Sequence, residues 1–222
     1  SFGESGMKKN LINSVLLFAA ALLLLFGVVY AWITLTPAVR VQQFVVNVNN
    51  YSADLRLDIK RNDDEYTEAV SAADVYELFH NTLPNDRLYF RLSITNNGNH
   101  PVTADIWMLG VFSENENEGY DMLDVFFLDG GKFVLDGTDY PVAVEPEEPV
   151  IRHGQELNLY RLNNIIDANH DFQIFDDLEF SANQTRVLEF ILVYDQNTEA
   201  LGYQGGILSI AAINIIFNIT GE

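Results

Sequence analysis

The chain has no cysteine and few basic residues, and both shortages restrict what it can do. Without cysteine there is no disulfide, no thiol nucleophile and no cysteine-based metal centre. Twelve Lys and Arg stand against thirty-two Asp and Glu, which gives a formal net charge of −20 at pH 7. Nucleic acid is therefore excluded as a natural partner, because phosphate binding needs a surplus of positive charge. A strongly acidic surface fits a protein that works outside the cell.

The local motifs of common enzymes are also missing. The chain has no GxSxG nucleophile motif, no HExxH pair and no glycine-rich phosphate loop. Its histidines are scattered without the spacing of zinc ligands; they are His80, His100, His153 and His170. We therefore predict a protein that is not an enzyme and that has no cofactor, with an extracellular hydrolase as a lesser alternative.

Long hydrophobic runs are absent after residue 40, but one lies before it. Val15 to Ile33 comprises nineteen residues without a charged or strongly polar side chain. This is the length of one bilayer-spanning helix or of a helix buried in an assembly. Lys8 and Lys9 precede the run, so the positive-inside rule places the N-terminus in the cytoplasm and the bulk of the chain outside. Pro37 ends the predicted helix.

Three fates of this helix stay open. The basic start, the Leu-rich run and the small residue Ala31 match a secretory signal peptide that is cleaved. The helix is alternatively a permanent membrane anchor. The third reading is a pilin-like helix, which lies in the membrane before assembly and in a filament core afterwards. All three predict export through the cytoplasmic membrane to the cell surface.

The rest of the chain alternates between apolar and polar residues, which is typical of half-buried β-strands. The clearest patterns cover residues 53–60, 87–97 and 101–112, and a turn around Gly98 predicts that the last two form a hairpin. A short helix is expected at residues 71–81, with Ser71 as its N-cap. Further strands are expected at residues 38–49, 122–128, 132–135, 156–162, 186–194 and 207–219. Short strands with frequent turn signals predict a mainly β fold, an antiparallel β-sandwich.

These patterns divide the chain into four segments. Residues 1–10 form a polar N-terminal extension, and residues 11–35 form the long hydrophobic helix that spans a membrane or lies in a filament core. Residues 36–50 form a linker and an extended apolar segment. Residues 51–222 form the β-sandwich domain, which is large enough for one core of its own.

Two acidic loops are candidate calcium sites, because Ca²⁺ takes several hard oxygen ligands. The second loop is similar to the first half of an EF-hand loop. It departs from that pattern at Phe172, where glycine is needed, and at Leu178, where a glutamate should stand. Solvated loops are the alternative interpretation. The candidate ligands are Glu114, Glu116, Glu118 and Asp121 in the first loop and Asp167, Asn169 and Asp171 in the second.

Three Asn-x-Ser/Thr triplets are candidate glycosylation sites, at Asn50, Asn183 and Asn218. A source that glycosylates its surface proteins would modify them, although an Asn-rich chain also produces such triplets by chance.

Three stretches resemble a known family. The run KKNLINSVLLFAAALLLLFGVVYAWIT is similar to the export segment of the TasA and camelysin family of matrix-fibre proteins. The stretch GYQGGILSIAAINIIFNITG resembles the final strand of that family, and ITNNGNHPV resembles one of its hairpins. Together these stretches cover about a quarter of the chain.

The resemblance implies a jelly-roll-like sandwich that polymerises when the N-terminal strand of one subunit completes the sheet of the next. The donor strand would then be residues 39–49, and the receiving groove would include the final strand. An extended apolar segment beside a tether needs such a sheet to bury its side chains and pair its backbone. The donor-strand interface residues implied in this way are Val39, Val41, Phe44, Val46 and Val48.

A weaker resemblance is to type IV pilins, which also carry a hydrophobic N-terminal helix before a β-rich head. Their glutamate near the start of the helix has no match here, since Glu4 lies outside the apolar run. Both resemblances imply a filament subunit whose partners are copies of itself. We therefore predict a structural subunit of an extracellular filament, a pilus or biofilm matrix fibre, with a monomeric membrane-anchored adhesion module as the alternative.

Overall fold

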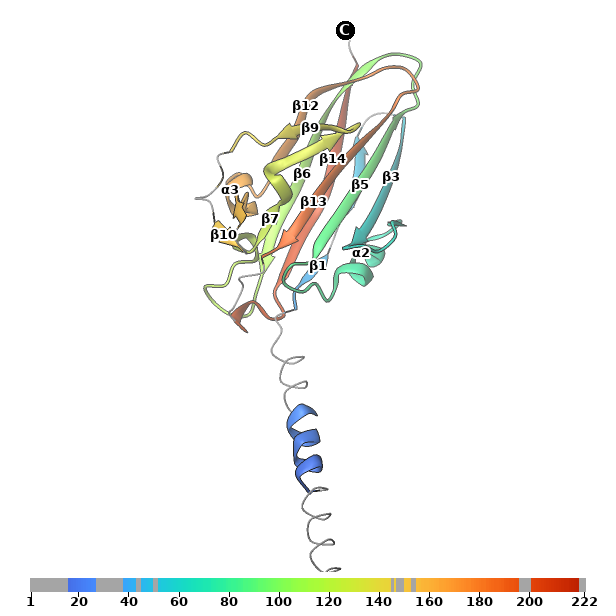
Figure 1. Cartoon of the computed structure of the whole chain (residues 1–222). Helices are drawn as coiled ribbons and strands as arrows, with labels where there is room; N and C mark the ends of the chain where they lie inside the picture. Colours follow the sequence, from blue (N-terminus) through green and yellow to red (C-terminus); the bar gives the residue numbers. More distant parts are fainter. Residues whose placement is uncertain are drawn as a thin grey trace, which may run out of the picture. The chain divides into compact units, whose positions relative to one another are not determined.

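A computed structural model of the chain (Figure 1) describes residues 16–26, 38–42, 45–49, 52–144, 146, 150–152, 155–195 and 201–219. The chain divides into two compact units, Ser1–Thr36 and Pro37–Glu222.

In the first unit, residues 16–26 form an α-helix. Seven of its large apolar side chains are 59% to 73% exposed: Leu16, Leu17, Phe18, Leu23, Leu24, Leu25 and Phe26. The remainder of the helix predicted at residues 11–35 lies outside the described residues. Within the described ranges, no helix has both the length and the apolar character needed to cross a bilayer.

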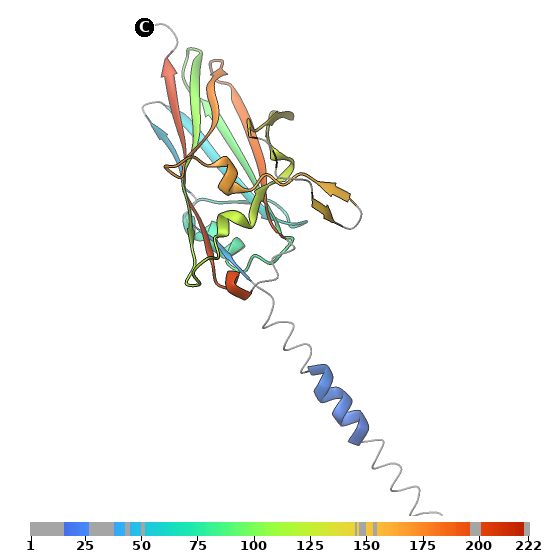
Figure 2. The same cartoon turned by 90° about the vertical axis from the view of Figure 1, so that its left-hand side faces the viewer.

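The second unit is mainly β, with two large sheets and few helices, as the alternating patterns predict. One sheet has five strands, in the order β1 (Arg40–Gln42), β14 (Ile207–Ile219), β6 (Val102–Glu114) and β12 (Phe172–Phe180), and β2 (Val46–Asn49) also pairs with β14. The other has seven, in the order β4 (Thr67–Glu68), β3 (Ala53–Arg61), β5 (Arg87–Asn96), β13 (Thr185–Tyr194), β8 (Lys132–Leu135) and β9 (Thr138–Pro141), and β7 (Phe126–Leu128) pairs with β13. Figure 2 shows these sheets as two layers.

Short elements complete the unit. A small separate sheet pairs β10 (Val150–Arg152) with β11 (Gln155–Leu157). The helices are α2 (Ala72–Phe79), α3 (Leu162–Ile165) and the 3-10 turns η1 (Met122–Asp124), η2 (Asp129–Gly131) and η3 (Leu201–Tyr203).

The core lies between the two large sheets and follows the predicted alternation. On β5, Leu88 and Phe90 have no exposed surface, and on β6 the same is true of Ala104 and Ile106. Inward-facing side chains of both sheets belong to one hydrophobic cluster. In that cluster the Phe90 ring stacks on Phe190, with centroids 4.8 Å apart. Burial of these apolar faces from water is the main force that holds the layers together.

The predicted short helix is confirmed as α2. Its acidic first turn is held by Asp74, whose carboxylate accepts hydrogen bonds from the backbone N–H groups of Ser71 at 2.7 Å and Val70 at 2.9 Å. The Ser71 N–H is the main reason that the pKa of Asp74 is lowered. Val75 and Phe79 are buried on the apolar face of the helix, so α2 covers one end of the core.

The predicted hairpin between residues 87–97 and 101–112 is wrong. β5 pairs with β3 and β13, whereas β6 pairs with β14 and β12, so the connection crosses from one sheet to the other. Asn96 is fully buried and explains why. Its amide donates to the carbonyls of His100 at 3.0 Å and Ser181 at 2.9 Å, and its oxygen accepts from the N–H of Gly98 at 2.8 Å. These bonds stabilise an arch rather than a tight turn.

The expectation of purely antiparallel pairing also needs correction. Among the described strand pairs, β1 and β2 run parallel to β14, and the others are antiparallel. Sequence patterns show that a segment is extended, but they do not show its direction relative to a distant partner.

Two other segments differ from their predictions. Residues 122–128 form η1 and then β7, and the strand predicted at residues 156–162 ends at Leu157. Strand β12 was not predicted, although it closes one edge of the five-stranded sheet. Its register with β6 shifts twice, between Gln173 and Phe175 and between Phe175 and Leu178. Such bulges break the alternation by which a strand is identified.

Candidate assembly site

The site with the best-defined geometry is the edge of the five-stranded sheet where β1 and β2 lie along β14. Arg40 pairs with Ile207 and Val46 pairs with Ile213, which is the same offset along the chain. The two short strands are therefore two parts of one extended segment in one parallel register. β14 itself pairs with β6 over almost its whole length on the other side, so it is an interior strand.

The first part of this segment is anchored by side-chain burial. Val39 and Val41 are both 0% exposed and belong to the hydrophobic core. Burial of two valines in this way contributes roughly 3 to 6 kcal/mol relative to leaving them in water. Removal of the segment would therefore expose an apolar strip of the core.

Backbone hydrogen bonds fix its ends. The N–H and carbonyl of Val39 exchange hydrogen bonds of 2.9 Å with those of Thr82, a buried residue just after α2. The N–H of Arg40 donates to the carbonyl of Gly206 at 2.9 Å, and the N–H of Ile213 donates to the carbonyl of Val45 at 2.8 Å. Thr82 was missed at the sequence level, because a single threonine in a polar turn carries no local signal of such pairing.

The second part of the segment is less enclosed. Val46 is partly buried against the core, and Val45 is 43% exposed. Phe44 and the side chain of Val48, both predicted in the donor strand, lie outside what the structure describes. Within the single chain the segment thus completes its own sheet, so the sheet is not left open for a neighbour as the sequence led us to expect.

The first acidic loop begins at Glu114, the C-terminal residue of β6. Glu116 and Glu118 are exposed in the following turn. Asp121 instead accepts a 2.8 Å hydrogen bond from the N–H of Leu123 and so caps η1. One carboxylate of the four is therefore already used to hold the local backbone.

The second acidic loop is likewise closed on itself. Asp167 Oδ1 accepts from the N–H groups of Asn169 at 2.8 Å and Asp171 at 3.0 Å, and Asp171 Oδ1 accepts from the N–H of Gly110 at 2.9 Å. The N–H groups of Asp171 and Asn169 lower the pKa of Asp167. In the described part of the chain, no three His, Asp or Glu side chains gather closely enough to hold a metal ion.

Two of the three glycosylation triplets are described. Asn183 is exposed in the turn between β12 and β13, with a positive φ of 57°. Asn218 is exposed near the end of β14, and its amide donates to Asp105 at 3.1 Å. Asn50 lies outside the described residues. Both described asparagines are on the surface, where a glycan would have room.

Comparisons with known proteins add little. No protein-family model matches the chain, and no curated protein matches it. A solved structure of AvmM, described with the words "AvmM Catalyzes Macrocyclization in Alchivemycin A Biosynthesis", is similar over 80% of this chain and 93% of that chain. The sequence identity is 10% and the TM-score is 0.29. A likeness at this level supports no inference about function.

Proposed function

We propose that the chain is a structural subunit of an extracellular filament that grows head to tail by exchange of residues 38–49 between neighbours. In this proposal the second unit is a jelly-roll-like β-sandwich, and residues 11–35 form the hydrophobic helix that spans the cytoplasmic membrane before assembly. The partners of the subunit are copies of itself, and the membrane is its partner until the fibre forms.

The observation that carries the proposal is the position of the segment. It lies at an edge of the sheet, it precedes the rest of the second unit in the chain, and its two short strands share one register with β14. The same hydrogen bonds and the same pockets for Val39 and Val41 are available whether the segment comes from its own chain or from a copy. Exchange therefore replaces every contact that it breaks.

The direction of growth follows from the same geometry. A donor segment and an acceptor edge are different surfaces, so their contact is heterologous, and such contacts generate filaments when the rotation from copy to copy does not close into a ring. The helix of residues 16–26 adds a second reason to associate, because its exposed leucines and phenylalanines would be buried against lipid or other helices.

A cysteine pair tests the exchange directly. Gln42 and Ser209 are register partners, and the Gln42 amide lies 3.5 Å from the Ser209 hydroxyl. Because the natural chain has no cysteine, every disulfide of a Gln42→Cys, Ser209→Cys variant involves the introduced cysteines, and the register favours the bond between them. Assembled material should give a ladder of covalent multimers on a non-reducing gel, and the ladder should collapse on reduction.

Controls separate assembly from chance oxidation. Gln42→Cys alone should give dimers at most. Deletion of residues 38–49 should abolish the fibres seen by negative-stain electron microscopy. If the double variant forms only an intrachain disulfide while fibres are still present, strand exchange does not hold them together.

A second function, a monomeric membrane-anchored adhesion module, is favoured by one observation. The segment already satisfies its own sheet, so the second unit is complete without a neighbour. In that case the double cysteine variant would be wholly intrachain, and the protein would stay monomeric in detergent.

A further inference from the structure

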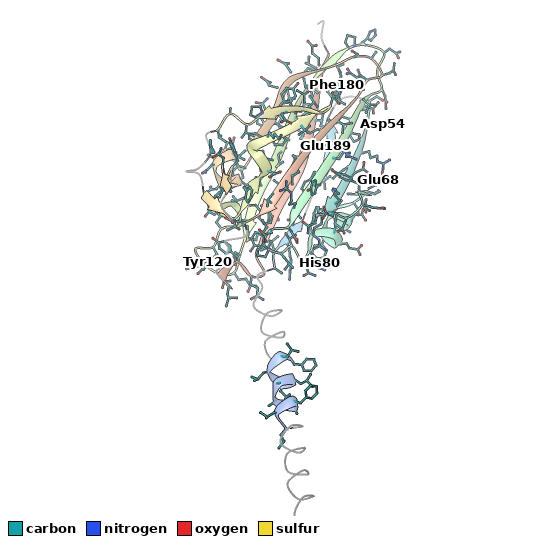
Figure 3. All side chains as sticks on the ribbon, viewed as in Figure 1. Asp54, Glu68, His80, Tyr120, Phe180 and Glu189 are labelled. Carbon is teal, nitrogen blue, oxygen red and sulfur yellow. The ribbon has the colours of Figure 1, made fainter. Side chains whose placement is uncertain are left out.

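The outer face of the seven-stranded sheet carries a hollow of about 220 Å³. Its floor is aliphatic and consists of Ile191 on β13 and Val134 on β8. Both are half-buried and lie between core residues that point to the other side of the sheet. Glu189, on the same face of β13 in the middle of the sheet, stands beside Val134 in the register (Figure 3). The hollow thus lies on the sheet that does not contain the assembly site.

One wall of the hollow is formed by the side chain of Tyr89. Tyr89 has Lys60 as its register partner on β3 and Ile191 as its partner on β13. The Lys60 ammonium lies 4.5 Å from the centroid of the Tyr89 ring. Arg87 also lies 5.9 Å from the centroid of this ring and donates a 3.2 Å hydrogen bond to its hydroxyl. Tyr89, which lines the hollow, is therefore held in place by two neighbouring cations.

Tyr66 extends this wall from the loop that follows β3. Its ring lies over the guanidinium of Arg91, with 4.0 Å from Cζ to the ring centroid, and Lys60 is 5.1 Å away. Burial raises the pKa of Tyr66, although Arg91 opposes that shift. Tyr66 and Tyr89 thus line the hollow beside its aliphatic floor, and contacts with Lys60 and Arg91 hold their rings in place.

Fixed carboxylates form the polar rim. Glu189 accepts a 2.7 Å hydrogen bond from Arg91, and Asp129 accepts one from Arg87. Lys132, which also lines the hollow, is paired with Asp139. An ionised carboxylate can accept about four hydrogen bonds, so Glu189 and Asp129 keep capacity for a ligand after their arginines are satisfied.

We propose that this hollow binds one hexose ring of a neutral polysaccharide. The C–H groups of a pyranose ring carry slight positive charge and are attracted to the negative face of an aromatic ring. Its hydroxyl groups, at the ring edge, would donate to Glu189 and Asp129 at the rim. The volume is below the 300 to 1,000 Å³ or so that drug-sized ligands occupy, which fits a single sugar ring.

Charge selects a neutral sugar over other ligands. Arg87, Arg91 and Lys132 at the rim are each paired with a carboxylate, and the whole chain has a net charge of −20. A polyanion is therefore repelled, and a basic peptide meets carboxylates that are already neutralised. A purely apolar ligand would leave the rim without hydrogen-bond partners. The expected affinity for one ring is weak, with a Kd of about 1 mM.

Affinity gel electrophoresis tests the site, with the full chain in a detergent that contains no sugar. The gels contain soluble β-glucan, galactan or mannan, with polygalacturonate as the anionic comparison. At least one neutral polymer should retard the protein while polygalacturonate does not. Tyr89→Ala should weaken the retardation at least about tenfold, whereas Tyr140→Ala, which removes an exposed tyrosine on β9 of the same sheet, should leave it unchanged.

A second variant guards against loss of fold. Val134→Trp fills the hollow from its floor and should abolish binding with little change in melting temperature, because Val134 faces outward. The proposal is overturned if none of the neutral polymers retards the protein, if polygalacturonate retards it as well, or if Val134→Trp binds like the natural chain. None of these outcomes depends on polymerisation, so the filament proposal stands or falls separately.

Discussion

Replacement of Asn96 by alanine should be among the most damaging single changes in the second unit. The Asn96 side chain is fully buried and joins three places in the chain: the arch after β5, the start of β6 and the turn between β12 and β13. Its removal deletes three hydrogen bonds. It also leaves the carbonyls of His100 and Ser181 and the N–H of Gly98 without this partner.

The magnitude follows from those three bonds. Each contributes about 1 kcal/mol net, and a buried group left unsatisfied costs more, so Asn96→Ala should lower the free energy of unfolding by roughly 3 kcal/mol. For a unit of this size that is a fall in Tm of roughly 6 to 12 °C. Differential scanning calorimetry measures both quantities. Asn97→Ala, an equal change at the exposed neighbour, is the control and should shift Tm by less than about 2 °C.

An isosteric variant sharpens the test. Asn96→Asp keeps the oxygen that accepts from Gly98 but replaces the donating amide by an oxygen that faces two carbonyls. Burial would raise the pKa of this aspartate, so the loss of stability is full above that raised pKa and shrinks as the pH falls toward about 4. If Asn96→Ala is no more destabilising than Asn97→Ala, the arch is not held by this side chain and our account of the crossing between sheets fails.

Three other predictions concern single residues elsewhere in the second unit. Gly131→Ala should destabilise by about 1 to 3 kcal/mol more than Gly137→Ala, because both glycines have positive φ but only at Gly131 would a Cβ lie 2.5 Å from the Tyr160 ring; chemical denaturation of the two variants gives the difference, and equal midpoints would contradict it. Asp195→Ala should cost about 3 to 5 kcal/mol, since Asp195 is 4% exposed and pairs with Arg161 at 3.2 Å; a Tm unchanged within error would show that the pair is not needed. Asp167→Asn should be less stable than the natural chain at neutral pH, and the difference should vanish as the pH falls through the lowered pKa of Asp167, below about 4; thermal melts from pH 7 to pH 3 measure it, and a constant difference would refute the assignment.

The sequence was informative where one face of a strand is buried. Leu88, Phe90, Val102 and Ile106 alternate with polar residues, and all of them lie in the core as predicted. The outward partners on these strands carried a signal as well, since the same alternation places Tyr89 on the outer face. What alternation cannot give is the sheet to which a strand belongs. Gly98 looked like the centre of a hairpin turn, but the connection is decided by the buried Asn96, two residues earlier, whose oxygen accepts from the N–H of Gly98.

The sequence was misleading where a strand is irregular. In β12, Asp176 and Asp177 interrupt the apolar residues, and Asp177 has a positive φ of 48°. The second register shift, between Phe175 and Leu178, accommodates these acidic residues. A pattern with period two cannot detect a strand that changes its register twice, so no element was predicted for residues 172–180. The pairing of Val39 with Thr82 is invisible for a different reason, because it joins two short segments that have no pattern of their own.

The two units differ in what they need from a partner, and this difference bears on how a filament would form. The second unit satisfies its own edge, because β1 and β2 already occupy β14. Because the segment is tethered to its own sheet, its effective concentration there is in the millimolar range. In dilute solution it should therefore pair with the β14 of its own chain and not with that of a copy. The helix of residues 16–26 has exposed apolar side chains, which favour association with lipid or with other helices. If the proposed filament forms, strand exchange should therefore compete only where helices hold subunits close together, at a membrane or at the end of a growing fibre.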